Sequence, residues 1–260
     1  MSPVDHVRNA RLTILGAGTC MLTPDRACSG YWIEAGSVRM RLDSGPGTMH
    51  AMTRFGLPWE TVTHQFISHF HLDHCGELPG LLWCLKHGRR APRSAPLEIL
   101  GPVGLKALLE TTSSMHGGGL FEQEFPITVR ELSPGDAVAL DGGVTLSVAK
   151  TPHTPESLAV RVEANGRSLG YTGDTAWSPD LPRFFGGVDV LVAECSYLEL
   201  PRGSRHLDLA QAATLAREAG ARRLVPTHFY FDPEAERLAE RLAAGYGGGI
   251  TVAGDGVTIE

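Results

Sequence analysis

The sequence predicts a layered α/β fold in which two mixed β-sheets are flanked by helices. Three observations predict it: short apolar segments with strand character dominate the chain, helical segments are interspersed among them, and one strand candidate is apolar along nearly its whole length, as strands buried on both faces are. The chain has 260 residues, of which 42% are hydrophobic and 20% charged, as is typical of a globular protein. No linker or repeat divides it, so we expect a single domain over residues 1–260.

In the first half of the chain, strands surround three helices. The helix over 46–55 has a proline in its first turn, where the missing N–H costs nothing. The strand over 64–68 leads into a histidine-rich loop. The expected strands are 12–15, 31–35, 38–42, 64–68, 97–100 and 127–132, and the expected helices are 46–55, 80–87 and 103–114.

The second half shows a hairpin signal and a buried strand. Asn165-Gly166 separates two strands and is typical of a tight hairpin turn. The segment 188–194 is the near-continuous apolar strand, and the Ala/Leu-rich helix over 208–219 ends before Gly220. The expected strands are 138–140, 144–150, 159–163, 168–171, 188–194 and 224–227, the expected helices are 208–219 and 233–244, and the tail 250–259 is expected to form a hairpin.

Composition narrows the class of protein. The formal net charge is −6 and the pI is about 6.0, which does not favour a nucleic-acid partner. The five cysteines are odd in number and include no C-x-x-C pair, which favours a reduced, cytoplasmic protein. Residues 1–11 lack the apolar core of a signal peptide, and no apolar run is long enough for a transmembrane helix, so we expect no membrane partner.

Ligand-type side chains are concentrated in one short segment. Residues 68–74 read S-H-F-H-L-D-H and place His69, His71, Asp73 and His74 directly after an apolar strand. His69 and His71 are two residues apart, so an extended backbone can point both the same way, while the other two follow in a turn. Packing three imidazoles together is costly unless something satisfies them, and a metal does so. One segment can therefore supply two metal positions.

The pattern H-x-H-x-D-H after an apolar strand resembles the metallo-β-lactamase superfamily. The resemblance extends along nearly the whole chain, because T-P-H-T-P-E-S with His153, Y-T-G-D-T with Asp174 and P-T-H-F with His228 match the family's later motifs in order. The opening L-T-I-L-G-A-G-T, L-D-S-G at 42–45 and D-H-C-G-E-L-P-G-L-L are most similar to the ribonuclease Z-like phosphodiesterase branch. The resemblance implies a four-layer αβ/βα sandwich with its site at one edge.

The resemblance also implies a site for two divalent metal ions. The implied ligands are His69, His71 and His153 for one ion, Asp73, His74 and His228 for the other, and Asp174 as the bridge. Imidazole and carboxylate ligands without a thiolate favour Zn²⁺, with Mn²⁺ or Fe as alternatives. Two such ions about 3.5–4 Å apart can hold a bridging hydroxide at neutral pH. Asp73 is then a catalytic candidate as well, because it can orient that hydroxide.

Two further residues have a functional and a structural interpretation. Asp43, in L-D-S-G, is a candidate acceptor for the N–H of a ligand imidazole, or it caps the turn before Pro46. His206, in R-H-L-D-L-A-Q, is not needed as a ligand, and the resemblance places an equivalent histidine over the scissile phosphate. It would donate a hydrogen bond to the phosphoryl oxygen or a proton to the leaving group. The alternative is a surface residue near the start of a helix.

Two other motifs suggest different chemistry and are disfavoured. The G-A-G at 16–18 begins like a dinucleotide fingerprint, but Met21 occupies the third glycine position and Pro24 interrupts the next turn. The G-x-S-x-G around Ser168 lies in the predicted hairpin, whereas a nucleophile elbow needs a strand, a turn and a helix. We interpret the H-G-G-G at 116–119 as the start of a mobile loop over 116–125, for which we suggest the role of a lid.

We therefore expect a dinuclear metal hydrolase that acts on a small phosphodiester or nucleotide. A ribonuclease Z-type action on tRNA is disfavoured, because those nucleases carry a long tRNA-gripping arm and the interval from His153 to Asp174 is just long enough for the hairpin. Hydrolysis of a lactone, ester or thioester is an alternative that the same ligands allow. A single-iron dioxygenase would use fewer ligands, and the complete ligand set disfavours a non-enzymatic role. The expected partners are a small-molecule substrate and, since dimers are common in similar families, a second copy in a homodimer.

Overall fold

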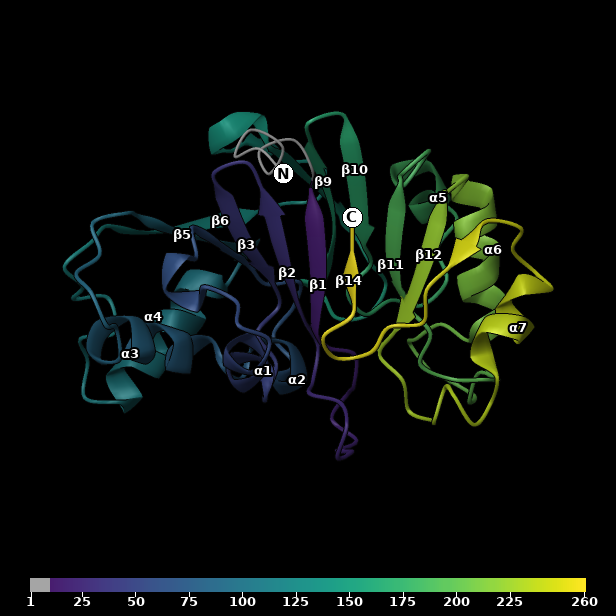
Figure 1. Ribbon diagram of the computed structural model, residues 1–260, viewed down its shortest axis with the longest axis horizontal. Helices are drawn as coiled ribbons and strands as arrows, with labels where there is room; N and C mark the ends of the chain where they lie inside the picture. Colours follow the sequence, from purple (N-terminus) through teal and green to yellow (C-terminus); the bar gives the residue numbers. More distant parts are fainter. Residues whose placement is uncertain (1–9) are drawn as a thin grey trace.

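A computed structural model describes residues 10–260 as two β-sheets at the centre of the molecule with helices on both outer sides (Figure 1). Most of residues 1–11, for which no signal peptide is expected, lie outside the described residues. This arrangement confirms the predicted αβ/βα sandwich. The helices beside the first sheet are α1 (Thr48–Arg54), α2 (Leu72–Cys75), α3 (Leu78–His87) and α4 (Leu105–Met115), and those beside the second are α5 (Asp180–Phe184), α6 (Leu209–Ala219) and α7 (Leu238–Ala243).

The first sheet is antiparallel on one side and parallel on the other. Its spatial order is β14 (Thr258–Ile259), β1 (Arg11–Gly16), β2 (Gly30–Ala35), β3 (Val38–Leu42), β4 (His64–Phe66), β5 (Leu97–Pro102) and β6 (Ile127–Leu132). The pairs from β14 to β3 are antiparallel, and those from β3 to β6 are parallel. Since Leu42 pairs with Phe66, β3 and β4 end at the same edge.

The second sheet repeats this division. Its spatial order is β13 (Gly249–Ile250), β12 (Arg223–Thr227), β11 (Val190–Glu194), β10 (Arg167–Tyr171), β9 (Leu158–Ala164), β8 (Thr145–Lys150) and β7 (Ala137–Ala139). The pairs from β13 to β10 are parallel, and those from β10 to β7 are antiparallel. As a result β8, β10, β11 and β12 all run in one direction, and their carboxyl ends meet at one edge.

Two apolar clusters hold the sandwich together: one fills the space between the sheets and continues to the helices beside the second sheet, and the other lies between the first sheet and its helices. In β1, Ile14 faces the layer between the two sheets, and the next residue, Leu15, faces the layer between the first sheet and its helices. In β2, Tyr31 likewise faces the space between the sheets, and Trp32 faces the helices beside the first sheet. This alternation is the period of two that a strand imposes when both of its faces are covered.

The tail of the chain does not form the predicted hairpin. Thr251 N donates to Leu224 O and Ala253 N to Pro226 O, both at 3.0 Å, so the chain first runs along β12. It then crosses to the first sheet, where β14 pairs antiparallel with β1. The prediction is wrong because two existing strand edges offer the backbone more partners than an isolated two-stranded ribbon does.

The helix predicted over 233–244 is shorter than expected. It spans only Leu238–Ala243, and Arg237, with φ of 50°, adopts a left-handed conformation just before it. The side chain of Asp232 accepts hydrogen bonds from the N–H groups of Glu234 and Ala235, as a helix N-cap does, but the left-handed Arg237 interrupts the segment, so the helix begins only after it. The short helices α2 and α5 were not predicted. Within residues 10–260, no helix is both long and apolar enough to cross a membrane.

Candidate metal centre

The predicted ligands gather where strands of both sheets end. His69 and His71 follow β4, His153 follows β8, Asp174 follows β10 and His228 follows β12. Because these strands end at one edge of the sandwich, residues far apart in the sequence come together there. Side chains at the carboxyl ends of parallel strands commonly line ligand sites for this reason.

Three histidines form the first ligand group, called group A (His69, His71 and His153). Nδ1 of His71 lies 3.1 Å from Nε2 of His69 and 3.1 Å from Nε2 of His153. Oδ2 of Asp174 lies 3.8 Å from the His69 nitrogen and 3.6 Å from the His153 nitrogen. His69 and His153 are buried, whereas His71 is exposed.

The second ligand group, called group B, is Asp73, His74 and His228. The Nε2 atoms of the two histidines are 3.3 Å apart, and Oδ2 of Asp73 lies 3.6 Å from that of His228. The other oxygen of Asp174, Oδ1, lies 3.2 Å from Nε2 of His74 and 3.4 Å from Nε2 of His228. Asp174 therefore turns one oxygen toward each group, an arrangement in which a carboxylate can bridge two ions.

These distances fit two divalent ions. Donors held at Zn²⁺–ligand distances in a tetrahedron lie about 3.3–3.4 Å apart, so the separations within each group match the edges of a coordination polyhedron. Oδ1 of Asp174 is buried and has no hydrogen-bond partner among the described residues. An unsatisfied buried carboxylate oxygen is costly, and a cation at this position would satisfy it.

Four of the ligand imidazoles are fixed through the nitrogen that faces away from the group. The contacts of Nδ1 are His69 with Ser68 Oγ at 3.0 Å, His74 with Asp43 Oδ2 at 2.7 Å, His153 with Arg205 O at 3.0 Å and His228 with Ser196 Oγ at 2.9 Å. Such contacts set the tautomer and the orientation of a ligand ring.

Asp43 connects both halves of the molecule at this point. Its Oδ1 accepts a hydrogen bond from Ser68 N at 2.7 Å, and its Oδ2 accepts from Ser68 Oγ at 2.8 Å and from Tyr171 Oη at 2.6 Å, besides the contact with His74. The residue before α1 is Gly47, and no side chain caps that helix. The geometry thus matches the imidazole-acceptor interpretation of Asp43 rather than the turn cap.

His206 lies beside both groups, and its imidazole is held by Glu194. Its Nδ1 is 3.2 Å from each carboxylate oxygen of Glu194 and 3.8 Å from Oδ2 of Asp174. Its side chain is only 15% exposed, and the cap of α6 is Asp208, so the surface interpretation does not fit. Glu194 also accepts from Leu207 N at 3.0 Å, which fixes the backbone beside the imidazole.

The loop after β1 contacts group B from its other side. Ala17 O accepts the backbone N–H of His228 at 2.9 Å, and Cys20 N donates to Oδ2 of Asp73 at 3.1 Å. His228 itself has φ of 63°, a left-handed conformation that costs energy in a non-glycine residue. The loop therefore helps to fix a strained ligand.

Sequence reasoning missed the residues that support the ligands. Asp255 accepts Ala17 N at 3.1 Å and Ala27 N at 2.8 Å, and so holds the loop after β1 from the tail of the chain. The sequence places Glu194 only at the end of the predicted apolar strand over 188–194, and it does not single out Ser196. A signal existed for Glu194, because a carboxylate at the end of a buried strand needs several donors. For Asp255 the sequence contains no comparable signal.

Burial and charge hold His69 and Asp174 in metal-binding form, whereas at His74 the charges of Asp174 and Asp43 outweigh burial and raise the pKa well above its ordinary value. Burial and the neighbouring His74 hold the pKa of His69 well below its ordinary value, so this imidazole is neutral. Burial alone would raise the pKa of Asp174, but His228 and His74 hold it well below its ordinary value. Burial would lower the pKa of His206, but the hydrogen bond and charge of Glu194 raise it. Neutral imidazoles and ionised carboxylates are the forms that bind cations.

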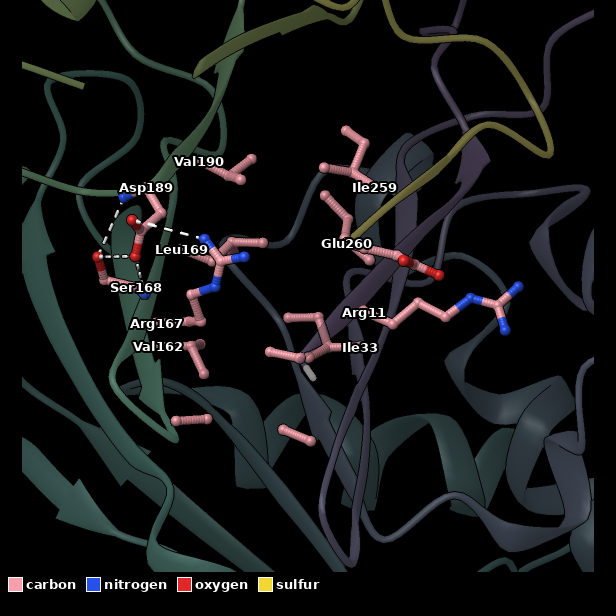
Figure 2. A pocket seen from close by; sticks show the side chains of 14 residues that line it. Arg11, Ile33, Val162, Arg167, Ser168, Leu169, Asp189, Val190, Ile259 and Glu260 are labelled. Carbon is pink, nitrogen blue, oxygen red and sulfur yellow. Dashed lines mark hydrogen bonds and ion pairs between the residues drawn. The ribbon is translucent and has the colours of Figure 1, made fainter. Parts of the chain in front are cut away.

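The competing motifs lie in structures that do not suit their chemistry. Ser168 is inside β10, at the end opposite to Asp174, and its hydroxyl contacts Asp189 at 3.3 Å in a largely apolar pocket (Figure 2). A Cβ on Gly16 would lie 1.9 Å from Cys28 O, so the glycines after β1 serve a tight loop. In the segment 116–125, Leu120 and Phe125 are buried in the apolar layer beside α3, and its role as a lid stays a prediction.

Comparison with known proteins gives one consistent family. The family model described as "Beta-lactamase superfamily domain" matches residues 39–229. An uncharacterized protein of Mycobacterium tuberculosis is 33% identical over 227 residues, which cover 85% of this chain and 81% of that protein. A ribonuclease Z of Myxococcus xanthus is 30% identical, with 96% of this chain and 97% of that protein covered.

A solved structure supports the same fold. The metallo-beta-lactamase fold protein YhfI of Bacillus subtilis matches with a TM-score of 0.81 and 21% sequence identity, over 96% of this chain and 98% of that one. The match therefore includes both sheets and the edge at which groups A and B lie.

Proposed function

Because this chain belongs to the β-lactamase superfamily, whose members are metal-dependent hydrolases, we propose that it is a phosphodiesterase acting on a small phosphodiester or nucleotide. One observation carries the proposal: Asp174 faces both ligand groups, while His206 lies beside them and is held by its contact with Glu194. A histidine that contacts a ligand site without being needed as a ligand is available to the substrate.

The protein side of the chemistry is to hold the ions and orient the reactants. When bound, two divalent ions, for which Zn²⁺ is favoured, would supply a water-derived nucleophile and positive charge against the developing negative charge. Asp73 would orient the attacking water, and Cys20 N fixes its Oδ2. Asp43 and Ser196 contact Nδ1 of His74 and of His228, so these imidazoles would be oriented to hold one of the ions through Nε2.

His206 would act on the phosphate. Glu194 occupies its Nδ1, which leaves Nε2 to donate a hydrogen bond to a phosphoryl oxygen or a proton to the leaving group. The raised pKa of His206 favours the protonated form that this role requires. Lactone and thioester hydrolysis would not need such a donor, which is why the phosphodiester is the preferred substrate.

Two features of the chain favour a small substrate. The interval between His153 and Asp174 is occupied by β9 and β10 with a two-residue turn, so it carries no tRNA-gripping arm. The net charge of −6 also opposes a long polyanion. The ribonuclease Z relative supports phosphodiester chemistry, and the lack of this arm favours a small substrate over tRNA.

The test is metal analysis together with turnover of three substrates by one preparation. We expect two ions per chain and hydrolysis of bis(p-nitrophenyl) phosphate, with little action on a lactone or a thioester. Hydrolysis of the lactone or thioester but not of the diester would replace the proposal with the alternative ester chemistry. One iron per chain with oxygen uptake would contradict both.

A further inference from the structure

Two tyrosines stand next to His206 in a position that the phosphodiesterase chemistry does not use. Tyr197 follows β11, and Tyr230 follows β12 two residues after His228. Their rings are stacked, with centroids 5.2 Å apart and planes inclined by 8°. Both side chains are only partly buried. A parallel aromatic pair with surface left open is what a planar ligand needs in order to stack.

The pair is continuous with the reacting region. The ring of His206 lies 6.0 Å from that of Tyr197 and 6.1 Å from that of Tyr230, and both contacts are edge to face. The ring of Tyr230 also lies 5.7 Å from that of His228 in group B. One small molecule can therefore place a flat ring on the tyrosines and a phosphate beside His206.

The backbone under both tyrosines is fixed by the site itself. Tyr230 N donates to Ser196 O at 3.2 Å, and Leu209 N donates to Tyr197 O at 3.0 Å. The hydroxyl of Tyr230 contacts Cys20 Sγ at 3.2 Å, in the loop that reaches Asp73. The next two residues of that loop, Met21 and Leu22, are exposed by 41% and 83%. The backbone and the ring of Tyr230 are thus held in place before a ligand binds.

We propose that Tyr197 and Tyr230 form an aromatic subsite that binds a nucleobase carried by the substrate next to its scissile phosphate. This inference rests on the proposed phosphodiesterase function and narrows its substrate class to base-bearing phosphodiesters. Stacking is tolerant of base identity, because every base has a π-face, so the subsite selects for the presence of a base rather than for one base. The stacked pair would select a flat ring over a flexible acyl chain.

The experiment compares two diesters that differ only in the base. They are the methyl ester of adenosine 5′-monophosphate and the methyl ester of 1-O-methylribose 5-phosphate, which share the sugar, the phosphate and the leaving group. We expect kcat/KM to favour the base-bearing diester by roughly 5- to 150-fold, the equivalent of ~1–3 kcal/mol for one stacked base. Tyr197→Leu and Tyr230→Leu should reduce this ratio toward one.

Matched variants separate stacking from structure. Tyr197→Phe and Tyr230→Phe keep the ring and should keep the ratio. Trp83→Leu removes another exposed aromatic side chain, one that contacts His87 instead, and should leave the ratio unchanged. A ratio near one in the wild-type protein would overturn the inference, as would a base preference that survives both leucine variants. An equal preference for an octyl ester of 1-O-methylribose 5-phosphate would show an apolar surface and not a base subsite.

A binding measurement keeps this inference distinct from the proposed function. Calorimetric titration of the metal-loaded protein with adenosine 5′-monophosphate and with ribose 5-phosphate should show the same preference and the same loss in the leucine variants. Hydrolysis of neither diester would contradict the phosphodiesterase proposal. In that case equal dissociation constants for the two ligands would also overturn the subsite. A lower dissociation constant for adenosine 5′-monophosphate than for ribose 5-phosphate would support it.

Discussion

Group A and group B share the bridging Asp174, but the protein holds them in different ways. Group B is fixed by residues from distant parts of the chain: Asp43 contacts His74, Ser196 contacts His228, and the loop after β1 contacts both His228 and Asp73. Group A has fewer such supports, and one of its ligands has none among the described residues.

In group A, Ser68 adjoins the ligand that it contacts, and the support of His153 is a backbone carbonyl. His71 is exposed, and its Nε2 has no hydrogen-bond partner among the described residues. Contacts around the ligands tune metal affinity, so we expect group B to be ordered before its ion arrives and group A to depend more on the ion itself. The ion of group A should exchange faster.

The largest effect should come from removing what the two groups share. Asp174→Ala takes one donor from each group at once, so both ions should be lost together with the diesterase activity. Metal content by mass spectrometry and turnover of bis(p-nitrophenyl) phosphate measure this, with circular dichroism to check the fold. Asp25→Ala, which removes an exposed carboxylate, is the matched control. Retention of two ions in Asp174→Ala would show that this residue is no bridge.

His206 should separate catalysis from metal binding. His206→Ala leaves every atom of groups A and B in place, so both ions should remain while kcat falls by roughly 10²–10⁴-fold, the usual contribution of a general acid or base. His50→Ala, at an exposed histidine, should change neither quantity. If His206→Ala loses metal, then this residue is a ligand and the proposed role on the phosphate is wrong.

The two groups also show which parts of the site can be predicted from the sequence and which cannot. The structure brings together every predicted ligand, because the ligands occupy short motifs directly after strands, and a strand end can be predicted from a local pattern. Their supports come from tertiary contacts, as Glu194 and Asp255 show. The crossing of the tail from β13 to β14, which brings Asp255 to the loop, depends on two sheet edges that no local pattern describes. Most strand and helix assignments succeeded for the same local reason, and the helix over 233–244 is interrupted at Arg237, whose left-handed backbone no local pattern predicts.

A variant of Asp43, which contacts His74 of group B, tests whether the two groups are held independently. In Asp43→Asn the side chain keeps its size, and asparagine tolerates the φ of 57° found here, but the charge that faces His74 is lost. In a His71→Ala background, which disables group A, the affinity of the remaining ion should fall by roughly 10–100-fold. In an Asp73→Ala background, which disables group B, titration should show a much smaller change. Equal losses in both backgrounds would mean that Asp43 supports the whole centre and that the groups are not held separately.

The smallest effect should come from Asp255, which reaches group B only through the loop after β1. Asp255→Asn weakens the hydrogen bonds that its side chain accepts from the backbone N–H groups of Ala17 and Ala27. The loop then positions His228 and Asp73 less firmly. Because the carboxylate acts two contacts away from the ion, the loss of affinity in the His71→Ala background should lie at or below the lower end of the ~10–100-fold range for direct supports. Asp25→Asn, on the same loop but exposed, is the control. A larger loss from Asp255→Asn than from Asp43→Asn would reverse this order, and the loop rather than the imidazole contact would then be the main support of group B.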